Sequence, residues 1–231
     1  SFSLPVPQFS ESFKDIYKID VSEFSKRADI FYISNKTNRY PFSCAGGTNR
    51  VDFVEKFKEG IERIVKLCNQ RDYSIVVKVY SKNRYLTLKE FWDDLKNMGG
   101  NNFSFYDVWD KGLSERFLST AKLIVWDQIG TGTLQCLTLS VPTMVLWERY
   151  HSRETRISKK YIDKLRDVGV IHNNVNEFDA EFQNFLKDPL KWMKDSKRQT
   201  AIKEFCDRYS NVHPRWKKIW KKTFKENFLI K

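Results

Sequence analysis

The chain has 231 residues, of which 41% are hydrophobic and 15% aromatic, so it can fill a core and is not an intrinsically disordered protein. Its formal net charge of +12 favours anionic partners, namely nucleotides, nucleic acid, acidic glycans or an anionic membrane surface. No apolar run approaches the roughly 20 residues of a membrane span, and the first residues lack the pattern of a secretory signal.

Six apolar segments predict β-strands along the chain. Continuous apolar runs, such as LIVW at residues 123–126, are typical of parallel strands that are covered on both faces. The predicted strands are residues 29–34, 74–80, 103–106, 123–126, 143–147 and 168–171. Helical spacing of apolar residues predicts helices at residues 53–68, 91–99, 112–120, 134–139 and 156–167.

The two ends of the chain differ from this middle part. Residues 1–28 contain two prolines near the start and are predicted to be a linker or extension, with a short helix near residues 13–17. Residues 29–175 are predicted to form the α/β domain. Residues 176–231 are predicted to be a helical segment that packs on this domain, with breaks near residues 188–189 and 213–214.

The alternation of strands and helices predicts an α/β fold with a doubly wound, mainly parallel, Rossmann-like six-stranded sheet and extra C-terminal helices. The commonest strand order of such sheets is 3-2-1-4-5-6, and ligands bind beyond the carboxyl ends of the strands where the order reverses. In that order the first and fourth strands are neighbours. The loops at residues 34–39 and 127–133 are therefore expected to meet.

The turn after the fourth strand is a candidate anion site. Asp127 ends the strand, and Gly130-Thr131-Gly132-Thr133 precedes a short helix, whose N–H groups and dipole would favour an anion at its N-terminus. The two threonine hydroxyls can donate hydrogen bonds to phosphate oxygens. An ordinary strand-to-helix turn is the alternative, and the position at the predicted order reversal favours the anion site.

Several polar residues are candidates to bind such an anion. Asn35, Lys36 and Arg39 lie in the loop after the first strand. Lys78, in an otherwise apolar strand, either faces a phosphate or sits in solvent at the strand edge, because a buried lysine is costly unless it is paired. Arg149, after the fifth strand, either clamps a phosphate or an acidic sugar or belongs to a solvated loop.

Several common sites are excluded by the spacing of residues. The turn matches neither the dinucleotide GxGxxG fingerprint nor a P-loop. The histidines and cysteines are scattered, so no metal site is expected, and the cysteines are expected to be free thiols of a cytosolic protein. The cysteines are Cys44, Cys68, Cys136 and Cys206, and the histidines are His151, His172 and His213.

The segment D-x-x-G-T-G-T-L-Q-x-L-x-L-x-V-P-T at residues 127–143 resembles the donor-site segment of GT-B-fold glycosyltransferases. It is most similar to a family of bacterial surface-carbohydrate transferases. In that family a strand ends in a polar residue before G/S-T-T-x-L-E-x-L-x-x-x-x-P-T and an apolar strand that ends in Trp. The resemblance covers the order of elements over residues 28–173, and the motif itself over residues 121–148.

The resemblance implies a C-terminal, donor-binding lobe that uses a nucleotide-activated sugar, requires no cofactor, and transfers the sugar to a sugar or other hydroxyl acceptor in the cytoplasm. By the same resemblance, Gly130 to Thr133 would hold the phosphates. Gln135 stands where the family often has a glutamate that contacts the ribose or the sugar. An amide keeps a hydrogen bond to a hydroxyl but is not a charge-assisted acceptor. An N-terminal acceptor lobe would lie outside this chain.

The catalytic base is not identified by the sequence. Inverting transfer needs a carboxylate or a histidine that deprotonates the acceptor hydroxyl. Asp127, Glu148 and His151 are the candidates, because they lie at or beyond strand ends near the predicted site. A structural or binding role is the alternative for each of them.

The C-terminal segment at residues 214–225 is both basic and aromatic. Such a helix can lie on an anionic membrane, here the inner face, as a peripheral contact. It can also pack its tryptophans on the sheet or on a second lobe, which is the interpretation that we favour from the sequence. For the whole chain, the alternative to a glycosyltransferase is a non-catalytic basic module that binds polyanions or an anionic membrane surface. No motif indicates specific nucleic-acid binding.

Overall fold

The structure, a computed structural model, describes residues 4–7, 10, 20–34, 53–79, 81–106, 120–147 and 154–227. Its centre is a six-stranded sheet in which every strand pair is parallel, and the strand order is β3-β2-β1-β4-β5-β6. The strands are β1 (Ala28–Ile33), β2 (Ile75–Lys78), β3 (Phe103–Phe105), β4 (Ala121–Trp126), β5 (Thr143–Leu146) and β6 (Ile171–His172). The predicted fold class and the predicted 3-2-1-4-5-6 order are confirmed.

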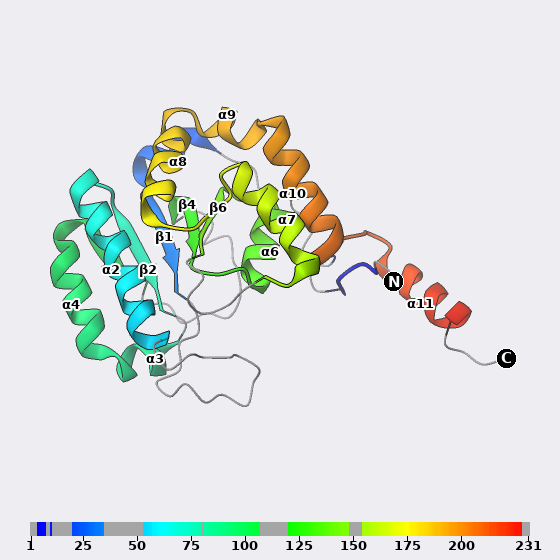
Figure 1. The fold of residues 1–231 in the computed structure, drawn as a ribbon, viewed down its shortest axis with the longest axis horizontal. Coiled ribbons are helices and arrows are strands. Elements are labelled where there is room, and N and C mark those ends of the chain that lie inside the picture. The colour runs from blue at the N-terminus through cyan, green and yellow to red at the C-terminus, as the bar shows by residue number, and fades with distance from the viewer. Residues whose placement is uncertain are drawn as a thin grey trace.

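Helices cover both faces of the sheet (Figure 1). The helices are α2 (Phe53–Arg71), α3 (Lys82–Thr87), α4 (Lys89–Gly99), α6 (Thr131–Thr138), α7 (Arg156–Asp167), α8 (Val175–Lys187), α9 (Pro189–Lys194), α10 (Ser196–Tyr209) and α11 (Trp216–Asn227). Two short 3-10 helices, η1 (Val21–Lys26) and η2 (Gly100–Asn102), precede β1 and β3. The predicted helices at residues 13–17 and 112–120 lie outside the described residues.

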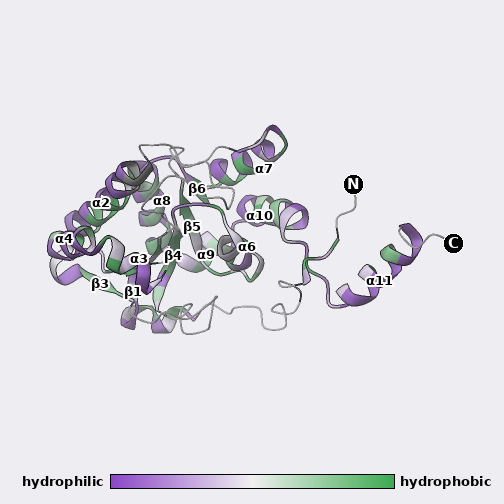
Figure 2. Ribbon diagram, turned by 90° about the horizontal axis from the view of Figure 1, so that it is seen from below, coloured by the Kyte–Doolittle hydropathy of each residue, from purple (hydrophilic) through white to green (hydrophobic). Residues whose placement is uncertain are grey.

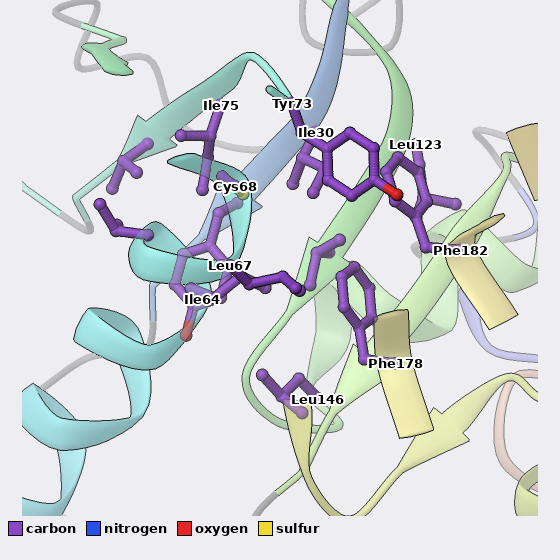
Figure 3. Packing of buried hydrophobic residues seen from close by; sticks show 14 of the residues in the cluster. Ile30, Ile64, Leu67, Cys68, Tyr73, Ile75, Leu123, Leu146, Phe178 and Phe182 are labelled. Carbon is purple, nitrogen blue, oxygen red and sulfur yellow. The ribbon is translucent and has the colours of Figure 1, made fainter. Parts of the chain in front are cut away.

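The larger part of the core lies between the sheet and helices α2, α4 and α8. Figure 3 shows Ile64 and Cys68 of α2 facing Ile30 and Leu123 of the central strands, with Phe178 of α8 close by. A second apolar layer on the other face joins α6, α7 and α10 to β5 and β6. Both faces of the central strands are therefore buried, as their continuous apolar runs indicated.

The sheet is also fixed at the amino ends of its central strands by a partly buried polar cluster. Asp29 accepts a hydrogen bond from Lys122 Nζ at 2.6 Å. Its other carboxylate oxygen accepts from the N–H of Ser74 at 2.9 Å and from the Ser74 hydroxyl at 3.0 Å. One side chain thereby ties β1 to the starts of β2 and β4, which holds the register of the central strands.

The boundaries differ from the prediction at two places. Phe24 of η1 is buried against Phe185, so residues 21–26 belong to the domain and are not a linker. The last strand begins at Ile171 instead of residue 168, because Gly169, with φ of +71°, forms the turn that closes α7. Helix α8, which belongs to the segment predicted to pack on the domain, packs on the sheet and contributes to the main core.

Helix α11 extends away from the sheet at the far end of α10, beside the N-terminal residues (Figure 1). None of its residues is buried. The interpretation that its tryptophans pack on the sheet is therefore wrong for the part of the chain that the structure describes. No helix among these residues is long and apolar enough to cross a membrane.

Candidate functional site

The carboxyl ends of β1 and β4 lie side by side at the centre of the sheet, where the strand order reverses. Ile33 of β1 is in register with Trp126 of β4 and with Lys78 of β2. The next residues of β1 and β4, Ser34 and Asp127, are each only 3% exposed. The sheet thus ends in polar residues at the place where doubly wound folds bind ligands.

Ser34 was not among the predicted site residues. Its backbone N–H donates to the Lys78 carbonyl at 3.1 Å, while its buried hydroxyl has no hydrogen-bond partner among the described residues. A buried hydroxyl without a partner is uncommon and costs stability. The signal in the sequence was a polar residue that ends an apolar strand, the same signal that identified Asp127.

The turn between β4 and α6 is held by Thr133. Its side chain is fully buried, and its hydroxyl donates to the Gln128 carbonyl at 2.9 Å and accepts from the Gly130 N–H at 3.3 Å. The hydroxyl hydrogen is therefore used inside the turn. The prediction that Thr133 donates to a phosphate is wrong for this conformation, and its role is to shape the turn.

Helix α6 begins with N–H groups for which no hydrogen bond is found among the described residues. The first intrahelical hydrogen bond runs from the N–H of Leu134 to the Gly130 carbonyl, so the N–H groups of the three preceding residues have no acceptor within the helix. The N-cap residue, Gly130, has no side chain that could accept from them. In contrast, Thr155 caps α7 and Asn174 caps α8 through their side chains. An anion can fill the uncapped position.

The two glycines of the turn have different surroundings. A Cβ added to Gly132 would lie 2.2 Å from Cη2 of Trp126, so glycine is required there for α6 to pack on the indole ring. A Cβ added to Gly130 would meet only Gln128 Nε2, at 3.9 Å, and Gly130 has an extended backbone that any residue can adopt. Packing against Trp126 explains why position 132 is a glycine. Neither steric crowding nor backbone conformation explains why position 130 is a glycine.

Two further predicted residues lie on the same side of α6. Thr131, the first residue of the helix, is exposed, and no hydrogen bond of its hydroxyl is found among the described residues. Gln135 is partly exposed and follows four positions later, so its side chain lies on the same helix face. Thr131 and Gln135 are therefore both able to reach a ligand at the helix N-terminus.

Lys78 is not in solvent at a strand edge. It is 8% exposed, it belongs to β2 inside the sheet, and its ammonium group lies 5.6 Å from the centre of the Tyr106 ring. The ring in turn packs edge-on against Phe31. This cation–π contact stabilises a buried charge. Lys78 shares the α6 side of the sheet with Ile33 and Trp126, two strands away from the turn.

Other predicted site residues cannot be placed. Asn35, Lys36, Arg39, Glu148, Arg149 and His151 lie outside the described residues, as does Cys44. Asp127 is described and is buried, so in this conformation its carboxylate is not open to an incoming acceptor. We assign it no catalytic role. The described ranges contain no group of three histidine, cysteine or acidic side chains that could hold a metal ion.

His172 ends β6 at the same edge of the sheet. It is buried against Phe178, and burial lowers its pKa to about 4, although the charge of Glu177 acts in the opposite direction. The imidazole is therefore neutral near pH 7. The described cysteines Cys68, Cys136 and Cys206 are free thiols, and burial raises the pKa of each, so they are not activated nucleophiles.

A hollow of about 360 Å³ lies elsewhere, between α7 and α10. Its charged lining residues include Lys164 and Glu204, which form an ion pair. It also contains Val168, which precedes β6, so it lies toward the amino ends of the strands. Neither the chemistry nor the position of this hollow matches a ligand site of a doubly wound sheet.

Comparison with known proteins identifies the family. The chain belongs to the LIC12162 family of transferases, whose family model matches residues 2–224. Among curated proteins none matches the sequence. Among solved structures, the UDP-GlcNAc 2-epimerase of Methanocaldococcus jannaschii, in complex with UDP-GlcNAc and UDP, is similar with a TM-score of 0.39 and 16% identity. The similarity covers 85% of this chain and 49% of the epimerase, so the chain spans about half the length of that protein.

Proposed function

We propose that this member of the LIC12162 transferase family is the donor-binding lobe of a GT-B-fold glycosyltransferase. It binds a nucleotide-activated sugar and transfers the sugar to a sugar or other hydroxyl acceptor in bacterial surface-carbohydrate synthesis. The observation that carries the proposal is the N-terminus of α6. This helix begins at the reversal of strand order, its N-cap is a glycine, and its first donors have no acceptor within the helix.

The proposed ligand group at this point is the phosphate of the donor. Backbone N–H groups of Thr131 and Gly132 donate to its oxygens, and the helix dipole favours its negative charge. The exposed hydroxyl of Thr131 supplies a further donor, and the missing side chain of Gly130 lets the phosphate approach the backbone. Gln135, one turn later, is placed to hydrogen-bond a hydroxyl of the ribose or the sugar.

Additional positive charge comes, in this proposal, from the predicted residues Lys36, Arg39 and Arg149, with Asn35 as a polar contact. These residues follow β1 and β5 in the chain, and the carboxyl ends of parallel strands share one edge of the sheet. With such groups to balance the phosphate charge, the proposal includes no metal and no cofactor.

The base that deprotonates the acceptor is proposed to be Glu148 or His151, or a residue of a second lobe. Asp127 is excluded in the described conformation because it is buried. The donor is made in the cytoplasm, so we place the reaction there.

The proposal is tested first by ligand binding. Thermal unfolding is followed with CMP, CDP, UDP, GDP and their sugars at millimolar concentration. A ligand present at about 100 times its Kd adds about 2.7 kcal/mol of stability, which raises the Tm of a chain of this size by roughly 5–10 °C. We expect one nucleotide and its sugar to do so. If none of them changes the Tm, the proposal fails.

A matched pair of variants then locates the ligand. Thr131→Ala removes the exposed hydroxyl at the start of α6, and Thr200→Ala removes an exposed threonine in α10 as a control. Loss of one hydrogen bond to a charged group costs roughly 1.5–3 kcal/mol, so Thr131→Ala is expected to raise the Kd about tenfold or more. The control keeps the Kd of the original chain. An equal effect of both substitutions would place the nucleotide elsewhere.

A further inference from the structure

Helix α11 has no contact with the sheet and no buried residue, yet it carries large apolar side chains. In Figure 1 it extends beyond α10 at the end of the molecule, and in Figure 2 it again lies outside the body of the domain. Phe224 is 47% exposed. Surface helices normally bury their apolar stripe against a core. The other apolar residues of the helix are partly exposed, so the apolar face of α11 is only partly covered by the described residues and can contact a further surface.

The apolar residues of α11 form one continuous stripe. They recur at the spacing i, i+3, i+4, i+7 and i+8, and the rings of Trp220 and Phe224 stack with centroids 5.4 Å apart. The stripe consists of Trp216, Ile219, Trp220, Thr223 and Phe224. Two of these side chains are tryptophans, which prefer the boundary between apolar and polar surroundings.

The rest of the helix surface is strongly basic. The only acidic residue between positions 215 and 227 is Glu226, which lies 3.7 Å from Lys222. The cations are Arg215, Lys217, Lys218, Lys221, Lys222 and Lys225. These residues occupy the helix surface that the apolar stripe leaves, so apolar and cationic groups lie on different sides of the helix.

N-terminal residues contact the helix and the segment that leads to it. Trp220 donates from Nε1 to the Pro5 carbonyl at 2.8 Å. The N–H of Val6 donates to the Asn211 carbonyl at 2.7 Å, and the N–H of His213 donates to the Ser10 hydroxyl at 3.2 Å. These contacts fix the connection between α10 and α11. At the other end of the stripe, Phe224 is half exposed.

We propose that α11 docks the protein on an anionic lipid surface. The aromatic stripe enters the interface, and the lysines around it contact the negatively charged head groups. Charge complementarity argues for this occupant. A second copy of the chain, itself at +12, would bring two cationic helices together, whereas an anionic bilayer offers both an apolar layer and opposite charge. The helix lies on the membrane and does not cross it.

The test is sedimentation of the 231-residue chain with lipid vesicles, without any nucleotide. One set of vesicles is pure phosphatidylcholine, and the other contains about one third phosphatidylglycerol. We expect binding to the anionic vesicles at about 0.1 M salt, and its loss at about 1 M salt, where the Debye length falls to about 3 Å. Equal binding to both sets of vesicles, or binding to neither set, would overturn the proposal.

Matched variants assign the binding to α11. Lys218→Glu with Lys221→Glu reverses two charges on α11, and Lys191→Glu with Lys197→Glu reverses two exposed lysines of α9 and α10. At about 1 kcal/mol for each lysine near the surface, the first pair is expected to lower the partition coefficient by at least roughly 30-fold. The second pair is expected to change it by less than about threefold, because these lysines lie away from the lipid.

Phe224→Asp tests the apolar part of the contact. The side chain is half exposed, so the fold is retained, and a charge in the stripe is expected to abolish vesicle binding. Circular dichroism confirms the fold of each variant. Sedimentation velocity provides the competing outcome. If the chain self-associates and Phe224→Asp makes it monomeric without changing vesicle binding, the stripe is an interface between copies and the lipid proposal is wrong.

Discussion

Gly130→Asp separates the function of the α6 N-terminus from its role in the fold. Gly130 has an extended backbone, and the nearest atom to an added Cβ is Gln128 Nε2 at 3.9 Å, so aspartate fits without a clash. Its carboxylate can accept from the N–H groups at the start of α6, which have no acceptor among the described residues, as Asn174 does at the start of α8. A better N-cap and a negative charge at the positive end of the helix dipole together add roughly 0.5–1 kcal/mol of stability.

The same carboxylate would occupy the place that we assign to the donor phosphate. Two like charges about 4 Å apart repel by about 4 kcal/mol at the effective dielectric constant of a protein surface. The donor N–H groups are lost as well, so the Kd for the nucleotide is expected to rise at least about 100-fold. The variant therefore becomes more stable and loses binding. Misfolding cannot produce that combination.

Calorimetric titration measures the Kd, and urea unfolding measures the stability. Gly130→Ser is the matched control, because serine caps the helix as well as aspartate but adds no charge. It should show a similar gain in stability from the cap and a smaller loss of affinity. If Gly130→Asp binds the nucleotide as tightly as the original chain, the phosphate does not lie at α6 and the proposed site is wrong.

Three further substitutions test the structure around this site. Gly132→Ala should lower the free energy of unfolding in urea by about 1–3 kcal/mol, because its Cβ would lie 2.2 Å from the Trp126 ring. Combining it with Trp126→Phe should remove most of this cost. If the costs of the two substitutions simply add, the packing argument is wrong. Thr133→Ala removes the hydrogen bond that the buried hydroxyl donates to the Gln128 carbonyl and should cost about 1–3 kcal/mol, whereas Thr131→Ala should leave stability unchanged. His172 has a pKa lowered by burial to about 4, so the unfolded chain takes up a proton first as the pH falls. About 3 kcal/mol of stability is therefore lost between pH 6.5 and pH 4, and His172→Gln should flatten this part of the pH profile.

The sheet could be predicted from the sequence because its strands are apolar along their whole length. Burial on both faces leaves a continuous run, such as residues 123–126, and parallel strands joined by helices have few common orders. An amphipathic pattern shows that α8 has an apolar face, but it does not show that this face completes the main core together with α2 and α4. The late start of β6 results from the turn at Gly169. The sequence did not indicate this turn, because the apolar residues on both sides of the glycine are typical of a strand.

The position of the candidate site could be predicted from the sequence, but the roles of its individual residues could not. Thr131 and Thr133 are equivalent in the sequence pattern, whereas in the structure Thr131 is exposed and Thr133 is buried in the turn. The solvent-edge alternative for Lys78 is wrong for a similar reason. The strand β2 that carries Lys78 lies inside the sheet, and its ammonium group contacts the ring of Tyr106, a residue outside that strand. Contacts of this kind join residues far apart in the chain, and periodicity does not report them.

The segment Gly130 to Thr133 combines two residues that the fold requires with two that it does not. Gly132 is fixed by the indole ring below it, and Thr133 by its hydrogen bonds within the turn. Nothing in the described packing demands glycine at position 130, where serine or aspartate would make a more stable helix start. The chain uses side-chain caps at α7, α8, α9 and α10, whereas the N-caps of α4 and α6, Leu88 and Gly130, make no side-chain cap hydrogen bond. Local rules are most often broken at functional sites. In the function that we propose, the donor phosphate takes the place of a side-chain cap at α6.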